Sequence, residues 1–375
     1  MDIRYLTAGE SHGKALVSIV DGIPAGLKLD AKFINSELAR RMKGFGRGAR
    51  MRIEKDKVEV LSGTRKGKTL GSPIALLISN KDFRIESLPP ISRPRPGHAD
   101  LAGALKFGEK DIRNILERAS ARETASRVAA GAVAKTLLRE FGIDFLSHVT
   151  SVGRIVSRRR LSFAKIKNTV EKSPVRCAET SASRLICLEI EKAKRDGDTL
   201  GGIFEVIARG VPAGLGSYAQ WDRRFDAALA GALMSIPGIK GVEIGLGFGA
   251  ARERGSAVHD EIFFNAKLGK FYRKTNAAGG IEGGITNGED IILRAAMKPI
   301  ATLVKALDSV NMKTKKKAKA QVERSDVCVV PSAGVIAESV TAIEVARAFR
   351  EKFGGDSLAE MKRNYQGYMK QLKRI

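Results

Sequence analysis

One seven-residue pattern occurs twice in this chain of 375 residues. Residues 21–27 read Asp-Gly-Ile-Pro-Ala-Gly-Leu, and residues 209–215 read Arg-Gly-Val-Pro-Ala-Gly-Leu. Each copy follows an apolar, strand-like run and precedes an amphipathic helix, expected over about 31–43 and 224–235. Each helix is followed in turn by another strand-like run. The repeat therefore predicts an α/β (α+β) fold in which one strand–turn–helix–strand unit is used twice.

No stretch of linker-like composition separates the two copies. We therefore expect one compact domain, residues 1–375, built from two related halves at about 1–190 and 195–375. The alternative is a chance similarity between two turns of a common kind.

The rest of the pattern is less regular. The polar, proline-rich residues 81–95 predict a loop. Ser120 followed by Glu123 fits a capping box, so an alanine-rich helix is expected over about 125–140. Alternation and apolar runs predict strands over 2–8, 15–21, 57–62, 73–79, 143–157, 184–191 and 240–245.

The chain carries a formal net charge of +25. Nucleic-acid binding, a polyanionic small substrate with a phosphorylated cofactor, and a basic host proteome each explain such an excess. Between Leu38 and Ile53 stand six basic residues and no acidic residue, with glycines at 44, 46 and 48 and only Phe45 as an aromatic. Such a loop favours an arginine clamp for phosphate and carboxylate over a base-stacking surface. The lysine-rich run 313–319 is expected to be a solvated loop, with a swing toward an anionic ligand as the alternative.

Composition also excludes several classes of protein. Apolar residues make up 43% of the chain, which excludes disorder as the dominant state. No apolar run is long enough to span a membrane, and the first residues show no secretory signal. The three cysteines have neither metal-ligand spacing nor an even count. We therefore expect reduced thiols, no metal site, no membrane contact and a cytoplasmic protein.

Only four histidines occur, and two of them, His12 and His98, stand in tight, glycine-flanked turns. Asp326 lies in a third polar cluster, 323–326, just before an apolar run. Two imidazoles, an aspartate and many arginines on turns indicate acid–base chemistry on an anionic substrate. Residues 9–13 also match the hydrolase pattern G-x-S-x-G, but no earlier strands precede them to form the sheet that a nucleophile elbow needs.

Two further segments favour a phosphorylated or flat ligand. Residues 275–288 contain two glycine pairs between amide side chains, so their backbone can wrap a ligand, with a flexible surface loop as the alternative. Arg118 and Ser120 stand just before the expected helix, whose amino terminus would favour an anion. Arg122, in the first turn, opposes the helix dipole, so it needs a compensating anion or an exposed position, and this misfit favours a bound anion. The run 245–250 approximates a dinucleotide fingerprint but has no acid at the expected distance, so we interpret it as a turn after a strand.

Taken together and in this order, these motifs resemble the chorismate synthase family. The likeness runs over nearly the whole chain, and each motif alone is only modest evidence. The matching segments are 6–13, 46–51, 93–100, 120–124, 240–243, the double-glycine loop, 297–299, 323–326 and 330–334.

The resemblance implies a fold, a reaction and partners. Family members convert 5-enolpyruvylshikimate 3-phosphate into chorismate and phosphate by an anti 1,4-elimination that requires reduced FMN (FMNH2). The implied fold is a sandwich with helices between two antiparallel β-sheets, and the implied assembly is a homotetramer. Because no reductase domain is apparent, we expect an external flavin reductase to supply the electrons, and no nucleic acid to take part.

The resemblance also assigns residues. His12 would protonate or hydrogen-bond the departing phosphate, His98 would stabilise the reduced flavin near N1, and Asp326 would assist removal of the C6 proton near flavin N5. The substrate anions would be bound by Arg41, Arg47, Arg50, Arg95, Arg122 and Arg324. The cofactor would be bound by Arg118, Ala119, Ser120, Gly238, Gly283, Lys298, Pro299, Ile300, Ala301, Thr302 and Arg324.

Two departures from the family pattern stand out. Pro237 and Gly238 occupy the place of an Asn-Ala pair, so only a backbone contact to the flavin is expected there. The loop 81–93 is shorter than in several relatives, which weakens any expectation of a lid. Two rival functions remain: a basic nucleic-acid-binding protein, which would tolerate His12→Ala, and an FMN-dependent oxidoreductase, which would consume reduced cofactor.

Overall fold

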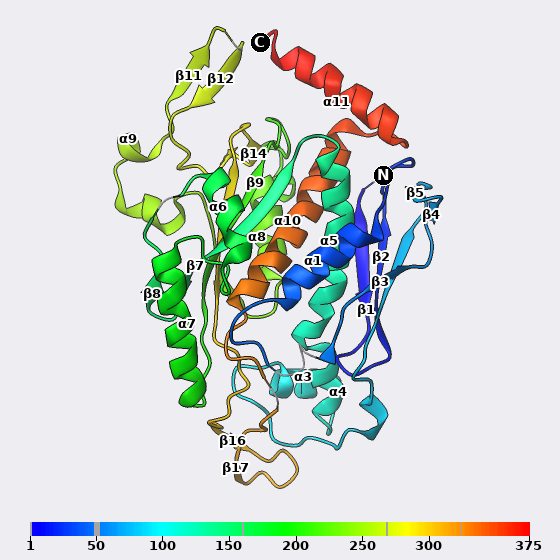
Figure 1. Cartoon of the computed structure of the whole chain (residues 1–375), viewed down its shortest axis with the longest axis vertical. Coiled ribbons are helices and arrows are strands. Elements are labelled where there is room, and N and C mark those ends of the chain that lie inside the picture. The colour runs from blue at the N-terminus through cyan, green and yellow to red at the C-terminus, as the bar shows by residue number, and fades with distance from the viewer. Residues whose placement is uncertain (1, 49–52, 160, 268, 324) are drawn as a thin grey trace.

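Two antiparallel β-sheets enclose a layer of helices (Figure 1). The computed structural model describes residues 2–48, 53–159, 161–267, 269–323 and 325–375. The first sheet has the order β1-β2-β6-β3, formed by β1 (Arg4–Ala8), β2 (Ala15–Asp21), β3 (Val58–Val60) and β6 (Ile74–Ser79). The second has the order β10-β15-β9-β7-β8, formed by β7 (Asp144–Val152), β8 (Ile155–Val156), β9 (Gly202–Arg209), β10 (Ile239–Ile244) and β15 (Ile291–Met297). The expected sandwich is confirmed.

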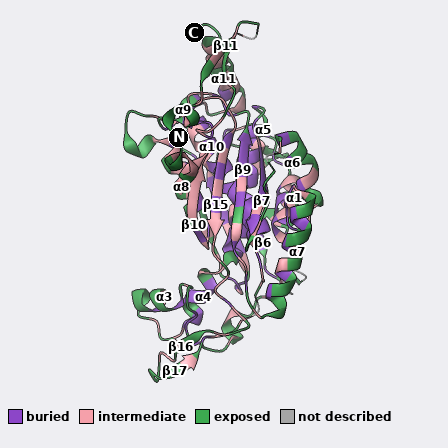
Figure 2. Ribbon diagram, turned by 90° about the vertical axis from the view of Figure 1, so that its left-hand side faces the viewer, coloured by how far each residue is buried: buried purple, intermediate pink, exposed green. Residues whose placement is uncertain are grey.

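The core lies where the helices meet each other and the sheets. The central helices are α1 (Ala31–Met42), α5 (Thr124–Arg139), α8 (Phe225–Met234) and α10 (Val330–Phe353). Helix α10 is buried along most of its length, because α5 packs on one side and strands β7 and β9 on another. A Cβ atom at Gly131 of α5 would collide with Ser339 of α10, so glycine there permits the close helix contact. Figure 2 shows the buried residues concentrated at the centre of the molecule, where strands β7 and β9 lie.

The two sheets repeat one topology. In each, leaving aside β8, the strands lie in the order first, second, fourth, third along the chain. The two seven-residue turns are also held in the same way. Leu27 N donates to Thr69 Oγ1 at 2.9 Å and that hydroxyl to Pro24 O at 2.6 Å. The equivalent bonds through Thr286 measure 2.8 Å from Leu215 N and 2.7 Å to Pro212 O. We propose on this basis that the halves, 1–190 and 195–375, are related.

Smaller elements surround the sandwich. Short two-stranded hairpins are formed by β4 (Thr64–Arg65) with β5 (Lys68–Thr69), β11 (Ile262–Asn265) with β12 (Lys270–Arg273), β13 (Ile281–Glu282) with β14 (Ile285–Thr286), and β16 (Asp308–Val310) with β17 (Lys317–Lys319). The other helices are α3 (Asp100–Phe107), α4 (Arg113–Arg118), α6 (Phe163–Thr169), α7 (Thr180–Arg195), α9 (Gly255–Val258) and α11 (Leu358–Leu372), with 3₁₀ turns at Ile85–Ser87, Ala121–Glu123, Val170–Lys172, Trp221–Arg223 and Gly247–Arg252. None of the helices in the described ranges combines the length and apolar character that a membrane crossing requires.

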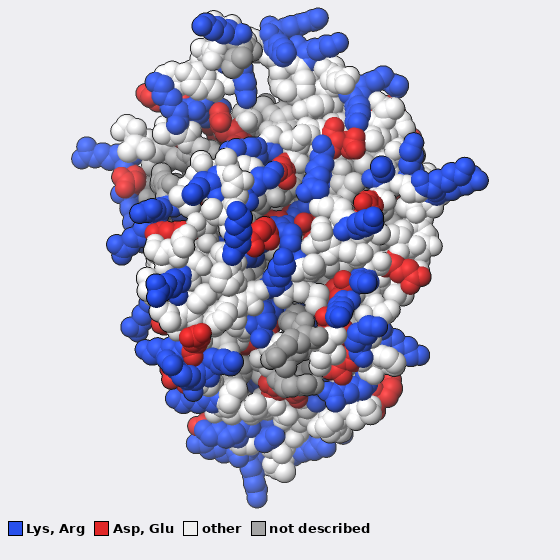
Figure 3. Space-filling view, viewed as in Figure 1, with Lys and Arg blue, Asp and Glu red and all other residues white. Residues whose placement is uncertain are grey.

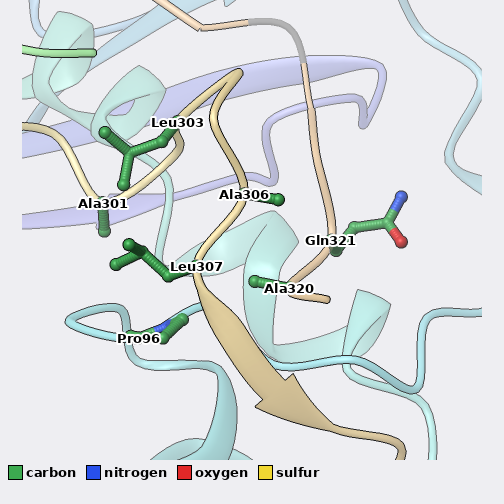
Figure 4. Close-up of a pocket in the computed structure, with 7 residues that line it drawn as sticks. All are labelled: Pro96, Ala301, Leu303, Ala306, Leu307, Ala320 and Gln321. Atoms are coloured by element: carbon green, nitrogen blue, oxygen red, sulfur yellow. The ribbon is translucent and has the colours of Figure 1, made fainter. Parts of the chain in front are cut away.

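Helices α3 and α4 and the hairpin β16–β17 lie together at the end of the molecule away from both termini (Figure 1). The hairpin is attached to the segment before α3, since Ser309 Oγ donates to Pro94 O at 2.6 Å. Apolar side chains from residues 301–307 gather with Pro96 and Ala320 in a crevice too narrow for water (Figure 4). One of these residues, Ala301, belongs to the segment 298–302, to which the resemblance assigns a cofactor-binding role.

Two sequence-based expectations need correction. The strand predicted over 184–191 is part of helix α7, whose buried residues follow helical spacing, as at Ala182, Ile186, Ile190 and Ala193. The capping box is also different from the expected one. Ser120 caps the 3₁₀ turn Ala121–Glu123 by accepting from Arg122 N at 3.3 Å, and helix α5 begins at Thr124.

Candidate active site

A cavity of about 500 Å³ opens where α4, the start of α5 and the start of α10 come together. It is lined by residues from both halves of the chain, from Ser11 to Ile336. Among the described residues, its wall carries two acidic side chains, Glu323 and Asp326, and a much larger set of cations: Arg41, Arg47, Arg84, Arg95, Arg113, Arg122 and Lys298. A wall of this composition suits a ligand with several negative charges.

The arginine loop after α1 is attached to the far end of the chain. Val327 N donates to Gly46 O at 2.8 Å, and Gly48 N donates to Asp326 Oδ1. A Cβ atom at Gly46 would lie 2.8 Å from the side chain of Ile190, so only glycine fits between α7 and this segment. Arg47 also pairs with Asp326 Oδ2 at 3.1 Å. The glycines therefore let the loop bring Arg47 to Asp326.

Arg41 and Arg122 share one buried carboxylate. Arg122 Nη1 lies 2.6 Å from Asp56 and Arg41 Nη1 lies 3.4 Å from it. Burial lowers the pKa of Arg41 to about 10; Asp56 opposes this shift, while Arg122 and Arg47 add to it. Arg122 also donates to Asn80 Oδ1 at 2.9 Å. The anion that Arg122 was expected to need is therefore supplied at least in part by the protein.

His12 is held by α4. Its Nδ1 lies 2.9 Å from Glu117 Oε1, and its backbone N–H donates to Glu117 Oε2 at 2.7 Å. Arg113 approaches the same carboxylate, with Nη1 3.7 Å from Oε1. Burial opposes ionisation of Glu117, but the hydrogen bonds from His12 outweigh it and lower the pKa of this carboxyl. The ring of His12 is therefore fixed by an ionised carboxylate.

His98 is held by a second carboxylate–arginine pair. Its Nδ1 lies 2.6 Å from Asp100 Oδ1, and Arg95 binds Asp100 through Nε at 2.8 Å and Nη2 at 2.9 Å. Burial opposes ionisation of Asp100, but hydrogen bonds from Arg95 and His98 outweigh it and lower its pKa. Arg95 Nη1 also donates to Thr302 Oγ1 at 2.7 Å, which connects this group to the segment 298–302.

The structure brings most of the expected site residues to this one cavity. His12, His98 and Asp326 all line it, although they are far apart in sequence. So do the following residues assigned to substrate or cofactor: Arg41, Arg47, Arg95, Arg122, Ala119, Ser120, Gly238, Lys298, Pro299, Ile300, Ala301 and Thr302. Arg50 and Arg324 lie outside the described residues.

Two of the described residues assigned to the cofactor do not line the cavity. The Arg118 guanidinium donates to Gly9 O and Thr7 O, each at 2.9 Å, and so supports the turn that carries His12. Gly283 lies in the β13–β14 turn, next to Gly284, whose carbonyl accepts from Phe225 N at the start of α8. The cavity instead receives Ile236, Pro237 and Gly238, which follow the other end of that helix.

Sequence reasoning missed several residues of the site: Arg84, Arg113, Glu117, Glu54 and Asp56. Arg113 and Glu117 stand four residues apart on one helix face, which is a signal for a pair but not for contact with His12. No local pattern distinguishes Asp56 from any exposed aspartate. Such carboxylates could be found only from the three-dimensional arrangement.

Comparison with known proteins agrees with this geometry. The family model for chorismate synthase matches residues 3–349. A chorismate synthase from Geotalea daltonii is 56% identical over 390 residues, covering 99% of each chain, and one from Symbiobacterium thermophilum is 55% identical over 391 residues, covering 99% of this chain and all of the other. A solved structure described as a crystal structure of chorismate synthase has a TM-score of 0.84 and 43% identity, covering 100% of this chain and 99% of its own. The chain therefore belongs to the chorismate synthase family and is a lyase.

Proposed function

We propose that this lyase converts 5-enolpyruvylshikimate 3-phosphate into chorismate and inorganic phosphate, the seventh step of the shikimate pathway to the aromatic amino acids. In the anti 1,4-elimination, the C–O bond to phosphate breaks, the C6 proton is removed, and a new double bond forms without net redox change. The observation that carries the proposal is the excess of cations over carboxylates on the cavity wall, where Arg41, Arg95, Arg113 and Arg122 are buried.

Some of these cations have N–H groups that can still donate hydrogen bonds to a ligand. Arg113 Nη1 and Arg122 Nη2 are buried and have no hydrogen-bond partner among the described residues. The guanidinium of Arg41 is so far desolvated that its pKa falls to about 10. A substrate with two carboxylates and a phosphate would satisfy such donors and offset the burial of their charge.

The residues around the cavity also fit reduced FMN. A volume of about 500 Å³ lies within the usual range of ligand sites. The backbone of 298–302, with Ala119, Ser120 and Gly238, would hold the cofactor, and burial together with Lys240 lowers the pKa of Lys298, which favours an anionic partner for that side chain. When bound, reduced FMN would supply electron density to the allylic system of the substrate.

Side chains of the protein itself would donate and remove the protons in this reaction. His12 donates to the oxygen of the departing phosphate, and the arginines hold the charge that develops there. His98 holds a proton toward the reduced flavin. Asp326, fixed by Arg47 and Gly48 N, assists removal of the C6 proton. We further propose that Arg50 and Arg324 bind substrate anions, and that Arg324, Arg118 and Gly283 contribute to the cofactor site.

Anaerobic release of phosphate from the substrate, with and without reduced FMN, tests the function. We expect release only with reduced FMN, no net consumption of it, and a loss of about 10²–10⁴-fold in turnover on His12→Ala or His98→Ala in folded protein. Release that ignores the flavin would refute the proposal. Net consumption of reduced FMN would favour an oxidoreductase.

The nucleic-acid alternative is tested by salt. On the face shown in Figure 3, lysines and arginines are spread over the whole surface and interspersed with acids, so they form no single stripe along which a strand would lie. A phosphate-backbone binder would lose affinity steeply as salt rises and would tolerate His12→Ala.

We also propose that the protein assembles as a homotetramer, acts in the cytoplasm and depends on an external flavin reductase. Leu6 and Ile19 support the assembly, because they face each other on β1 and β2 and are 75% and 42% exposed. The free cysteines Cys177, Cys187 and Cys328 are compatible with a reducing compartment. Steady turnover by the purified protein with oxidised FMN and NADPH alone would refute dependence on a separate reductase.

A further inference from the structure

The reaction proposed above needs a proton at the departing phosphate, and His12 is the imidazole that would supply it. Its two ring nitrogens have different surroundings. Nδ1 lies 2.9 Å and 3.1 Å from the two oxygens of Glu117. Nε2 lies 3.9 Å from Asp82 Oδ2, which is beyond hydrogen-bond distance. Nδ1 therefore faces helix α4, and Nε2 is on the other side of a ring that lines the cavity.

Glu117 is built into the protein more firmly than a surface carboxylate. Its side chain is 2% exposed. It accepts from the backbone N–H of His12 as well as from the ring, and its own carbonyl accepts from Ser11 N at 2.9 Å. Helix α4 and the turn 11–13 are thus joined by side-chain and backbone bonds, which fix both the position and the orientation of the imidazole.

Other charged groups also face this pair. Arg113, on α4, approaches Glu117 at 3.7 Å and binds Glu323 at 3.2 Å. Asp82, on the segment after β6, binds Arg84 at 2.9 Å. The carboxylates of Glu117 and Asp82 thus flank the imidazole, and each is accompanied by an arginine.

An ionised carboxylate only accepts hydrogen bonds, so the nitrogen that faces Glu117 must carry a proton. We propose that Glu117 is a positioning residue for the proposed elimination: it keeps one proton on Nδ1 of His12, so that the proton passed to the leaving phosphate is a second one, carried by Nε2. The proposal rests on the proposed function for its catalytic part. The tautomer itself can be measured without any substrate.

Glu117→Gln is the informative variant. The amide has nearly the same shape, but it offers one acceptor oxygen and one N–H₂ donor. The oxygen can still accept from the backbone N–H of His12, and the N–H₂ group then meets Nδ1 and requires it to be an acceptor. The bond from Ser11 N to the backbone of residue 117 is unaffected. The variant is therefore expected to fold and to hold His12 with a single proton, on Nε2. The ring can then no longer act from its doubly protonated form, which is the stronger acid.

The first readout is the ¹⁵N NMR spectrum of the full chain with labelled histidine, which has only four imidazoles to assign. In the native protein, Nδ1 of His12 is expected to show the shift of a protonated nitrogen. In Glu117→Gln, Nδ1 is expected to show the shift of an unprotonated nitrogen. The control is Glu109→Gln, the same change at a residue just before α4 that binds Asn114 at 3.0 Å and lies outside the cavity; its spectrum should match that of the native protein.

The second readout is turnover, as phosphate release from 5-enolpyruvylshikimate 3-phosphate with reduced FMN. We expect kcat to fall about 10- to 100-fold in Glu117→Gln, within what a general acid contributes, while KM changes by less than about threefold. A native ring spectrum in the variant overturns the proposal, whatever the turnover; so does unchanged turnover with a switched tautomer. If the native protein itself releases no phosphate, the proposed function fails, and the spectra still decide whether Glu117 sets the tautomer.

Discussion

Arg40 and Arg41 are neighbours on helix α1, yet they enter two different kinds of charged environment. Arg40 binds Glu338 through two bonds of 2.8 Å, and it also binds Glu37 and Glu171. Its pKa is raised, because these carboxylates outweigh the burial that would lower it. Arg41 faces the cavity, where burial outweighs the attraction of Asp56 and lowers the pKa of Arg41 to about 10.

Among the described residues, the group around Arg40 is balanced in charge and mostly buried. It contains three cations, Arg40, Lys135 and Arg176, and three carboxylates, Glu37, Glu171 and Glu338. In the cavity, Glu323 and Asp326 lie on the wall, and other carboxylates stand behind its cations: Asp56 behind Arg41 and Arg122, Asp100 behind Arg95. The first arrangement holds helices together; the second keeps positive charge oriented toward a ligand.

The largest expected effect is a difference in the free energy of unfolding between Arg40→Met and Arg41→Met. Arg40→Met leaves Glu338 and Glu37 buried with fewer partners and should lower the free energy of unfolding by about 3–5 kcal/mol. Arg41→Met removes a desolvated charge, and Asp56 keeps Arg122, so the loss should stay below about 2 kcal/mol. Urea unfolding of both variants measures the difference. Equal losses would show that the two environments do not differ in this way.

Affinity for the ligand should instead be reduced more by Arg41→Met than by Arg40→Met. Arg41→Met removes hydrogen bonds to a charged ligand worth about 1.5–3 kcal/mol, so affinity for the proposed substrate should fall about 10- to 150-fold. Calorimetric titration with that substrate provides the measurement. Arg40→Met, studied where it is folded, serves as the control and should bind like the native protein. Unaltered binding by Arg41→Met would contradict the proposed role of this residue.

The effect of pH should have opposite signs at two positions of helix α10. The pKa of Glu338 lies below its ordinary value of 4.5, because Arg40 and Lys135 outweigh burial. Its contribution is therefore present above pH 4.5 and is lost as the pH falls toward the folded-state pKa. Burial raises the pKa of Glu344, so ionisation of this group opposes folding as the pH rises.

Relative to Glu338→Gln, the native protein should thus lose its advantage in stability as the pH falls from about 5 to 3. Relative to Glu344→Gln, it should gain stability as the pH falls from above the raised pKa of Glu344 toward 4.5, its ordinary value. Denaturant unfolding across this range gives both differences. The same sign at the two positions would be inconsistent with these environments.

The smallest effect is expected in the lysine-rich hairpin. Lys317 and Lys319 are 80% and 66% exposed and pair with Asp308 rather than with the cavity wall. Changing both to Gln should alter KM by less than about twofold at physiological salt, because exposed charges are screened. Steady-state kinetics at two salt concentrations measures this. A larger rise in KM would support the alternative in which the loop swings toward the ligand.

The sequence patterns predicted the parts of the fold that have local signals. The strand–turn–helix units and the cavity residues on glycine-rich turns, such as His12 and His98, were located from motifs. The segment from Leu185 to Ile190 is a short, mostly apolar run, which fits a buried strand as well as part of a helix, and only length and packing decide in favour of α7. The helix-dipole argument for an anion at Arg122 overlooked Asp56, which a distant loop supplies.

The carboxylates behind the cations could not be predicted for the same reason. Asp56, Asp100 and Glu117 act through neighbours that are brought to them by the fold. Asp100 is the partial exception, because it stands two residues from His98. Glu117 meets His12 across 105 residues of sequence, and no pattern in either segment indicates that contact.

The attachment of Gly46 and Gly48 to Val327 and Asp326 has a consequence for the newly made chain. During synthesis the arginine loop leaves the ribosome long before the residues that must hold it. Until those last residues arrive and α10 docks, the cationic wall stays open and hydrated. The cavity with its full set of cations is therefore available to a ligand only after the residues of α10 have been synthesised and the helix has packed.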